Sequence, residues 1–489
     1  MIDVTVKVHD KYQLEIKLTH QFEENRRVSS YKVNFFLFIP NSLDINYSTY
    51  KKKDFYSDIQ NYIRFKTPVY LINQIYEGNN SPYAKLRKAC TNLVELPDKK
   101  TVAEYEYHLK MFSSITKSAL RDYVVFIGAK TNPSEIVELT ETFKDQVEDL
   151  CRHFRQLKTI INVPTVEKNI YAILLYGDEY LSLLIEKYTF KLLEFLKRIK
   201  TEQSDRAAER LLALIRSEIN YRSQNGYESV PQDNSDNESV IFRFSVLKKY
   251  LESVLFIDTA KEPEGQFVKQ LLISLAAGLA MLFATAVAFW GHSVYGSYTM
   301  PIFITLIVSY MLKDRIKELM RIFFTRKISR RLYDQRIKIL SGNKKIGVFK
   351  EAFDFVKKKN LPQAIVQLRN LGRSKEFDSK FSRESVICYR KKIALYKNLY
   401  TTNYHDYQIN GINDILRLNV SPFLKKMDNP DKPLYILQDK GYKKTRAQRV
   451  YHINLVIKYI FEEDEHLVRY RLVLNRRGIK RIEKIPSVI

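Results

Sequence analysis

A run of 43 residues without a charged side chain extends from Gln270 to Leu312. A hydrocarbon layer about 30 Å thick is crossed by roughly 20 helical residues, so the run has room for two helices and a tight turn. We therefore expect a transmembrane helical hairpin within residues 265–312, with spans at about 271–290 and 294–312. A buried helical hairpin in a large soluble core is the alternative, but charge-free runs of this length are rare in soluble helices.

Basic residues crowd the end of this run and predict its orientation. They are Lys313, Arg315, Lys317, Arg321, Arg326, Lys327, Arg330 and Arg331. The positive-inside rule then places both termini in the cytoplasm, in a multi-pass protein of the plasma (inner) membrane. Charges throughout residues 1–18 argue against a signal peptide.

Small residues recur every four positions in both expected spans. They are Ala276, Ala280, Ala284 and Ala288 in the first, and Ser297, Pro301, Thr305 and Ser309 in the second. Such stripes let helices approach closely in lipid, which favours packing of the two spans on each other. An oligomer interface is the other interpretation. His292 is the only ionisable side chain of the run, so proton relay or coupled transport is not expected.

The rest of the chain divides by its hydrophobic periodicity, and the fold class expected is an α+β multidomain membrane protein. We expect an α+β cytoplasmic domain at 1–130, a helical bundle at 131–264, a basic juxtamembrane helical region at 313–385 and a mainly antiparallel β domain at 386–489. Alternation at residues 4–8 and 14–18 predicts a hairpin, and residues 123–128 look like a strand. A heptad seam from Ile136 to Ile161 predicts one long helix of the bundle or an oligomeric coiled coil.

Positive charge is concentrated in the second half of the chain. The whole protein has 81 Lys and Arg against 55 Asp and Glu, and residues 313–489 account for +24 of the net charge of +26. A basic region beside a membrane first meets anionic lipid headgroups, each nearby cation contributing about 1 kcal/mol. Residues 313–331 also carry apolar side chains at helical spacing, so this helix is expected to lie on the anionic surface. Nucleic acid is a second candidate partner, but no DNA- or RNA-binding motif specifies it.

Catalytic motifs are absent from the sequence, and we expect neither a cofactor nor a metal. No phosphate loop, dinucleotide fingerprint, zinc-protease, nucleophile-elbow or kinase motif occurs. The weak candidates are the phosphate-loop-like Gly128–Thr131, the pair His405–Asp406 with His452 and His466, and the acidic run Glu462–Glu465. Three distant cysteines (Cys90, Cys151 and Cys388) exclude a disulfide scaffold and are expected to be buried thiols.

The function expected from these features is that of a membrane-anchored cytoplasmic scaffold or sensor, with its basic C-terminal region docked on anionic lipid or on a protein partner. A homo-oligomer is compatible with it. Two alternatives remain open at this stage. One is a membrane-bound enzyme whose catalytic residues are dispersed along the chain, and the other is a membrane tether for nucleic acid.

Overall fold

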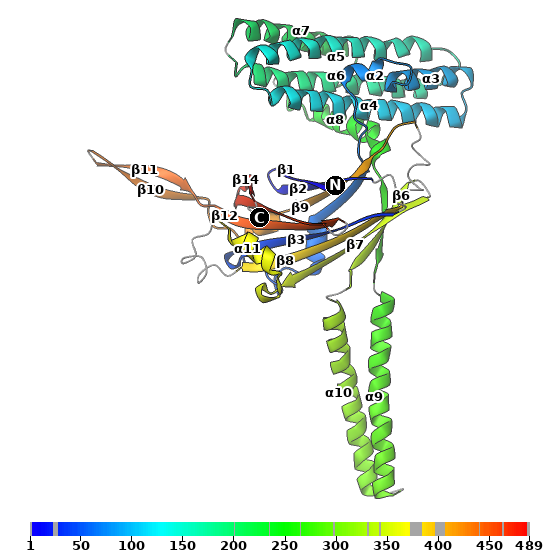
Figure 1. Ribbon diagram of the computed structural model, residues 1–489, viewed down its shortest axis with the longest axis vertical. Helices are drawn as coiled ribbons and strands as arrows, with labels where there is room; N and C mark the ends of the chain where they lie inside the picture. The colour runs from blue at the N-terminus through cyan, green and yellow to red at the C-terminus, as the bar shows by residue number, and fades with distance from the viewer. Residues whose placement is uncertain are drawn as a thin grey trace. The chain divides into compact units, whose positions relative to one another are not determined.

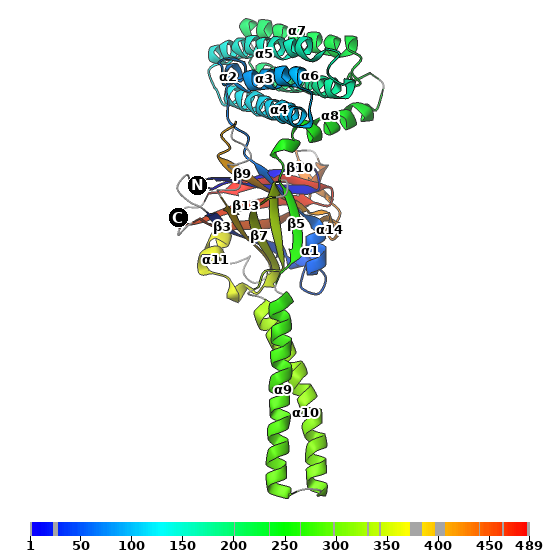
Figure 2. The ribbon, with the colours of Figure 1, turned by 90° about the vertical axis from the view of Figure 1, so that its right-hand side faces the viewer.

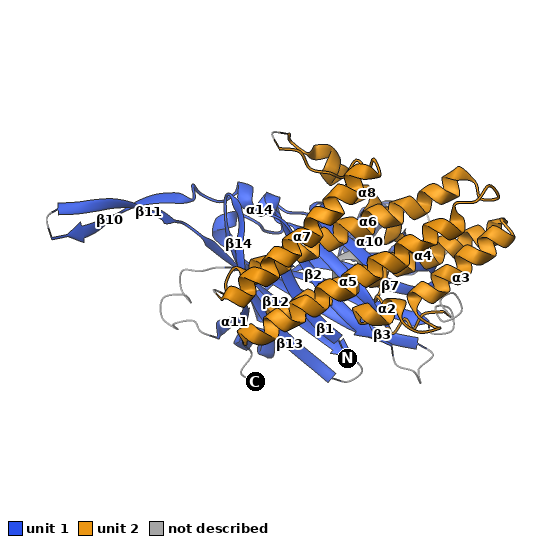
Figure 3. Cartoon of the chain, turned by 90° about the horizontal axis from the view of Figure 1, so that it is seen from above, with its two compact units in different colours: residues 1–63, 257–405, 411–489 blue, residues 64–256, 406–410 orange. Residues whose placement is uncertain are grey.

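The computed structural model describes residues 2–22, 28–199, 201–233, 235–264, 266–296, 299–329, 332–341, 344–371, 384–396, 406–439, 441–461 and 464–486. The chain forms two compact units (Figure 3). Unit 1 consists of residues 1–63, 257–405 and 411–489, and unit 2 of residues 64–256 and 406–410. The second unit is thus an insertion in the sequence of the first.

Unit 1 is built on two sheets (Figure 1). The four-stranded sheet has the order β1 (Ile2–Val8), β2 (Gln13–Gln21), β9 (Gly411–Asn419) and β4 (Ile59–Phe65). The eight-stranded sheet has the order β14 (Gly478–Ile485), β13 (Asp464–Asn475), β12 (Tyr451–Phe461), β3 (Val28–Pro40), β8 (Glu384–Tyr396), β7 (Lys344–Val356), β6 (Gln335–Ser341) and β5 (Asp258–Pro263). All neighbours in the larger sheet are antiparallel.

The expected N-terminal hairpin is confirmed, with Val4 opposite Leu18 and Val6 opposite Ile16. The side chains of Leu14, Ile16 and Leu18 are buried, as alternation of apolar and polar residues predicts for a sheet with one covered face. Strand β3 is instead buried on both faces from Phe35 to Ile39, because it lies in the middle of the eight-stranded sheet. Its sequence is accordingly a continuous apolar run.

Both faces of the larger sheet carry a core. On one face, residues of both sheets line a common small space: Leu14, Ile16, Leu416 and Leu418 from the smaller sheet, and Phe35, Leu37, Tyr389 and Leu455 from the larger. On the other face, Phe36, Phe38, Val386, Cys388 and Val456 pack with Ile365 and Leu368 of helix α11 (Gln363–Asn370). Short helices α1 (Lys52–Asp58) and α14 (Ser421–Lys425) complete the unit, with 3₁₀ turns at 41–43 and 358–360.

Unit 2 is helical (Figure 2). Its helices are α2 (Ile72–Tyr76), α3 (Pro82–Glu95), α4 (Lys99–Gly128), α5 (Pro133–Ile161), α6 (Lys168–Leu196), α7 (Glu202–Gln224) and α8 (Glu238–Leu251). All eight heptad positions from Ile136 to Ile161 are buried along α5, including the interrupting Thr140. The seam therefore serves packing within the bundle, with α5 lying against α3, α6 and α7.

An antiparallel helical pair follows β5, formed by α9 (Gln266–Tyr295) and α10 (Met300–Ser329) (Figure 2). The expectation of two membrane spans is wrong: in the part of the chain that the structure describes, only α9 is long and apolar enough to cross a membrane. In α10 the apolar stretch ends at Leu312, so 13 residues cover about 20 Å of a layer about 30 Å thick.

The register between α9 and α10 also limits the length over which both helices are apolar. The Ser309 hydroxyl donates to the Ala284 carbonyl at 3.4 Å, which places Lys313, one turn further along α10, near the level of Ala280. The length that is apolar on both helices therefore extends from there to the turn, about 24 Å. A multi-pass plasma-membrane localisation accordingly has no support, and the chain is a mixed α/β protein with 51% of residues in helices and 30% in strands.

Two further segments differ from the sequence-based expectation. Residues 123–128, which look like a strand, form the last turns of α4, because burial on one side of a long helix outweighs the β propensity of Val124 and Val125. The region 313–385, expected to be helical, contains strands β6 and β7, which join the large sheet. In β6, Lys338 lies between the buried residues Ile337 and Ile339, a period of two that the high basic content obscures. Strand β7 is instead buried on both faces from Ile346 to Phe349.

Candidate functional site

The basic residues after Leu312 lie along α10. Arg315 and Lys317 are exposed, Lys313 lies 3.8 Å from the centre of the Tyr310 ring, and Arg321 pairs with Glu318 at 3.3 Å. Arg326 and Lys327 belong to the last turns of the helix. Arg330 and Arg331 lie outside the described residues. Contact of these side chains with an anionic surface stays a prediction.

The small residues of the hairpin lie in part between the two helices. Ala276 and Ala280 are buried, and Ser309 is 3% exposed where it reaches the backbone of α9. Thr305 lies beside Gly291, where an added Cβ would be 3.4 Å from its methyl group. Ala284 and Ala288 are half-buried and Pro301 is exposed, while Ser297 lies outside the described residues. Whether this stripe also mediates oligomerisation stays a prediction.

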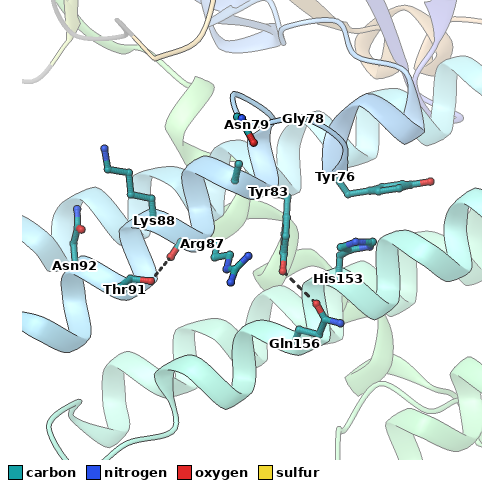
Figure 4. Close-up of a pocket in the computed structure, with 11 residues that line it drawn as sticks. Tyr76, Gly78, Asn79, Tyr83, Arg87, Lys88, Thr91, Asn92, His153 and Gln156 are labelled. Atoms are coloured by element: carbon teal, nitrogen blue, oxygen red, sulfur yellow. Dashed lines mark hydrogen bonds between the residues drawn. The ribbon is translucent and has the colours of Figure 1, made fainter.

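Unit 2 contains an open groove between the α2–α3 segment and α5 (Figure 4). Its volume is about 640 Å³, and it is lined by Tyr76, Gly78, Asn79, Tyr83, Ala84, Arg87, Lys88, Thr91, Asn92, His153 and Gln156. Arg87 and Lys88 are exposed and form no ion pair with any residue that the structure describes. Two cations beside amide and hydroxyl groups suit a small anionic ligand.

The wall of the groove is aromatic. The His153 ring stacks on Tyr76 with centroids 5.0 Å apart and meets the edge of Tyr83 at 5.4 Å. His153 Nδ1 lies 2.8 Å from the Asp149 carbonyl oxygen, which can only accept, so Nδ1 carries the proton and donates. Burial raises the pKa of the Tyr83 hydroxyl. An imidazole that stacks on one phenol and meets the edge of another, without a carboxylate partner among the described residues, offers a planar aromatic surface to a ligand.

Two charge clusters are centred on buried carboxylates. In unit 2, the fully buried Asp178 carboxylate accepts from Tyr221, Tyr227 and Lys158 at 2.6, 2.8 and 2.7 Å. In unit 1, Lys391 Nζ lies 2.5 Å from an Asp414 oxygen, and each side chain is 1% exposed. Such satisfied networks stabilise one arrangement of neighbouring elements, and each of these links separate elements of its unit.

The chemical candidates from the sequence do not converge. Gly128 ends α4, so no phosphate loop forms there. Asp406 lies 3.7 Å from His108 in unit 2, whereas His452 and His466 are on β12 and β13 of unit 1. His405, Glu462 and Glu463 lie outside the described residues. No group of three or more His, Cys, Asp or Glu residues suited to a metal occurs within the described ranges.

The cysteines are unsuited to nucleophilic chemistry. All three are free and buried. Burial raises the pKa of Cys90 and of Cys388 to about 12 and that of Cys151 above its ordinary value. A thiol that stays protonated at neutral pH is a poor nucleophile.

Sequence reasoning missed the groove because its lining comes from two segments some 60 residues apart that only the packing of α3 on α5 brings together. It also did not predict that β10 (Asp431–Gln438) pairs with β11 (Gly441–Gln448) as a separate ribbon. There a signal exists in the turn at Gly441, whose φ of +108° suits glycine. The chain matches no protein-family model, no curated protein and no solved structure.

Proposed function

We propose that this protein is a non-enzymatic scaffold or sensor, attached to one face of a membrane through α9 and docked on anionic headgroups through basic residues of unit 1. The observation that carries the proposal is the exposure of α9. Only 11% of its most apolar window is buried, so it is not the core helix of a soluble domain, which would be covered on most sides. An exposed apolar surface of this length needs an apolar environment.

Attachment from one side is supported by the strands that flank the hairpin. Strands β5 and β6 pair in the same sheet, with Pro263 opposite Gln335, so the chain enters α9 and leaves α10 at one edge of unit 1. The apolar ends of the two helices then reach into the lipid, and Arg315 and Lys317 on the charged part of α10 lie toward its surface. Each would contribute about 1 kcal/mol near an anionic membrane.

The groove in unit 2 supports the sensor part of the proposal. Its unpaired cations, Arg87 and Lys88, and the aromatic wall around His153 form a place for a small anion carrying a planar ring. Within the part of the chain that the structure describes, no acid–base pair lies beside these groups, which is why we favour binding over catalysis.

Vesicle flotation of the full chain tests the attachment. We expect the protein to float with phosphatidylcholine vesicles that contain phosphatidylserine, and the substitutions L282D and F289D to abolish flotation, because both side chains are exposed on α9 and a buried carboxylate is costly in hydrocarbon. I241D and F242D on α8 form the matched control, since they make the same change at apolar side chains that are equally exposed.

The headgroup contribution is tested separately. R315A with K317A should weaken flotation with anionic vesicles at low salt and leave binding to neutral vesicles unchanged. Flotation that is equal for wild type and the α9 variants, or lost equally in the α8 control, would contradict the proposal.

A further inference from the structure

Strands β10 and β11 form a two-stranded sheet of their own, the arm (residues 431–438 and 441–448), which extends away from the other strands of unit 1 (Figure 1). Its base is fixed, because the Asp431 carboxylate accepts from Arg477 in the turn between β13 and β14, and Arg449 pairs with Asp428. The described residues of its distal part form no such ion pair. An isolated two-stranded hairpin is marginally stable in water. We therefore expect an arm of this length to be stabilised by contact with a partner.

Apolar side chains of the arm are unusually exposed. Leu437 is 87% exposed, Tyr442 71% and Tyr435 63%. The two tyrosine rings lie edge to face with centroids 5.5 Å apart, which is the diagonal arrangement expected of side chains on one face of paired strands. Leu434 and Ile436 are also exposed, on the opposite face.

Cations lie on both faces of the arm. Strand register places Lys444 opposite Tyr435 and Arg446 opposite Pro433 on the face of the tyrosines. Lys443 is opposite Ile436, on the other face with Lys432. These four side chains have no hydrogen bond or ion pair with the residues that the structure describes. Four unpaired cations on a narrow ribbon are suited to a densely anionic polymer.

We propose that the arm binds double-stranded nucleic acid by entering a groove. A two-stranded ribbon has the width that the major groove admits, and the backbones flanking a groove present phosphates on both sides of an inserted ribbon. Cations on both faces match that distribution. Exposed tyrosines and aliphatic side chains near the tip then contact base edges, while Lys443, Lys444 and Arg446 bind phosphates.

The same observations disfavour two other occupants. A lipid surface is flat and meets one face of a ribbon, which would leave the cations of the other face unused, and Asp439 at the turn opposes insertion into lipid. A second copy of the arm would bring like charges together, which is unfavourable. The proposal concerns a different surface from α9, so it stands whether or not α9 binds lipid.

Fluorescence anisotropy of the full chain with a labelled DNA duplex tests the proposal. Removing three phosphate contacts with K443A, K444A and R446A should make the slope of log K against log salt less negative by about 2.7, which is a loss of affinity on the order of 100-fold near 0.15 M salt. The matched control is K357A, K358A and K359A, which removes equal charge from exposed lysines elsewhere in unit 1. It should change affinity far less.

A second variant isolates the contacts with bases. Y435A with Y442A should weaken duplex binding while leaving the salt slope unchanged, because the tyrosines carry no charge. Equal losses in the arm and control triple variants would overturn the proposal, since binding would then follow net charge alone. Stronger binding to single strands than to duplex would also overturn it. Loss of vesicle flotation, or of self-association, in the arm variants with duplex binding intact would assign the arm to lipid or to a second copy instead.

Discussion

Replacing Asp178 with alanine should destabilise unit 2 more than any exposed charge in the same helices. The carboxylate is fully buried on α6 and holds together two other helices and the loop after α7. It lies 2.7 Å from Lys158 Nζ and 3.4 Å from Arg155 Nε, and it accepts from Tyr221 and Tyr227. Alanine would leave two cations and two hydroxyls facing a cavity.

The magnitude follows from those contacts. Removing one partner of a buried charge pair costs about 3–5 kcal/mol. Lys158 and Arg155 keep 19% and 24% of their side-chain surface in solvent, so water recovers part of their solvation and the lower half of that range applies. We expect the free energy of unfolding of unit 2 to fall by about 3–4 kcal/mol. Asp178→Asn should lose less, since its amide oxygen still accepts from a tyrosine.

Hydrogen exchange of the amides of α6, read by mass spectrometry, is the assay, because the two units need not unfold together and a single midpoint would mix them. Asp145→Ala is the matched control. Asp145 is 72% exposed and 3.5 Å from Lys144, a pair worth less than about 1 kcal/mol. If both variants shift exchange in α6 by the same amount, the buried cluster does not stabilise the bundle and the reasoning fails.

Two further predictions concern titratable groups. Burial lowers the pKa of His20 to about 4. Below pH 6.5 the unfolded chain therefore binds a proton that the folded chain does not, and the free energy of unfolding should fall by about 3 kcal/mol between pH 6.5 and 4. The free energy of unfolding read from hydrogen exchange of the β2 amides should show this decrease in wild type and lack it in His20→Gln; parallel pH profiles would contradict the prediction. The three buried cysteines should not react with a thiol reagent at pH 8 in the native protein, and all three should react after denaturation. Rapid reaction of one cysteine in the native protein would contradict this, because it would show an accessible thiolate.

Local periodicity predicted some elements from the sequence. The seam in α5 and the hairpin of β1 and β2 follow directly from spacings of seven and two residues. The second span was mispredicted because a charge-free run gives only the length of an uncharged segment. It does not give the length over which two paired helices are both apolar. That depends on the register that sets Ser309 against Ala284, which only the structure gives.

Pairing between strands that are far apart in the sequence accounts for most of the features that sequence reasoning did not predict. Strand β3 pairs with β8 and β12, so Phe36 lies opposite both Cys388 and Val456. Nothing within a window of 20 residues specifies such partners, since the strands on either side are similar in composition. The groove beside His153 and the buried pair Lys391–Asp414 were hidden for the same reason, because each joins segments that are distant in sequence.

The insertion of unit 2 between β4 and β5 has a consequence for synthesis on the ribosome. Strand β3 leaves the ribosome more than 340 residues before its neighbours β8 and β12, so for most of translation its backbone hydrogen-bonding groups and its apolar side chains have no partner strand. Unit 2 is nearly contiguous and rich in local helical contacts, which favours rapid folding. Unit 2 can therefore fold before the first strands of unit 1 have their partner strands. Chaperones that cover extended apolar segments would then be needed at the strands that precede unit 2 in the nascent chain rather than at the helical bundle.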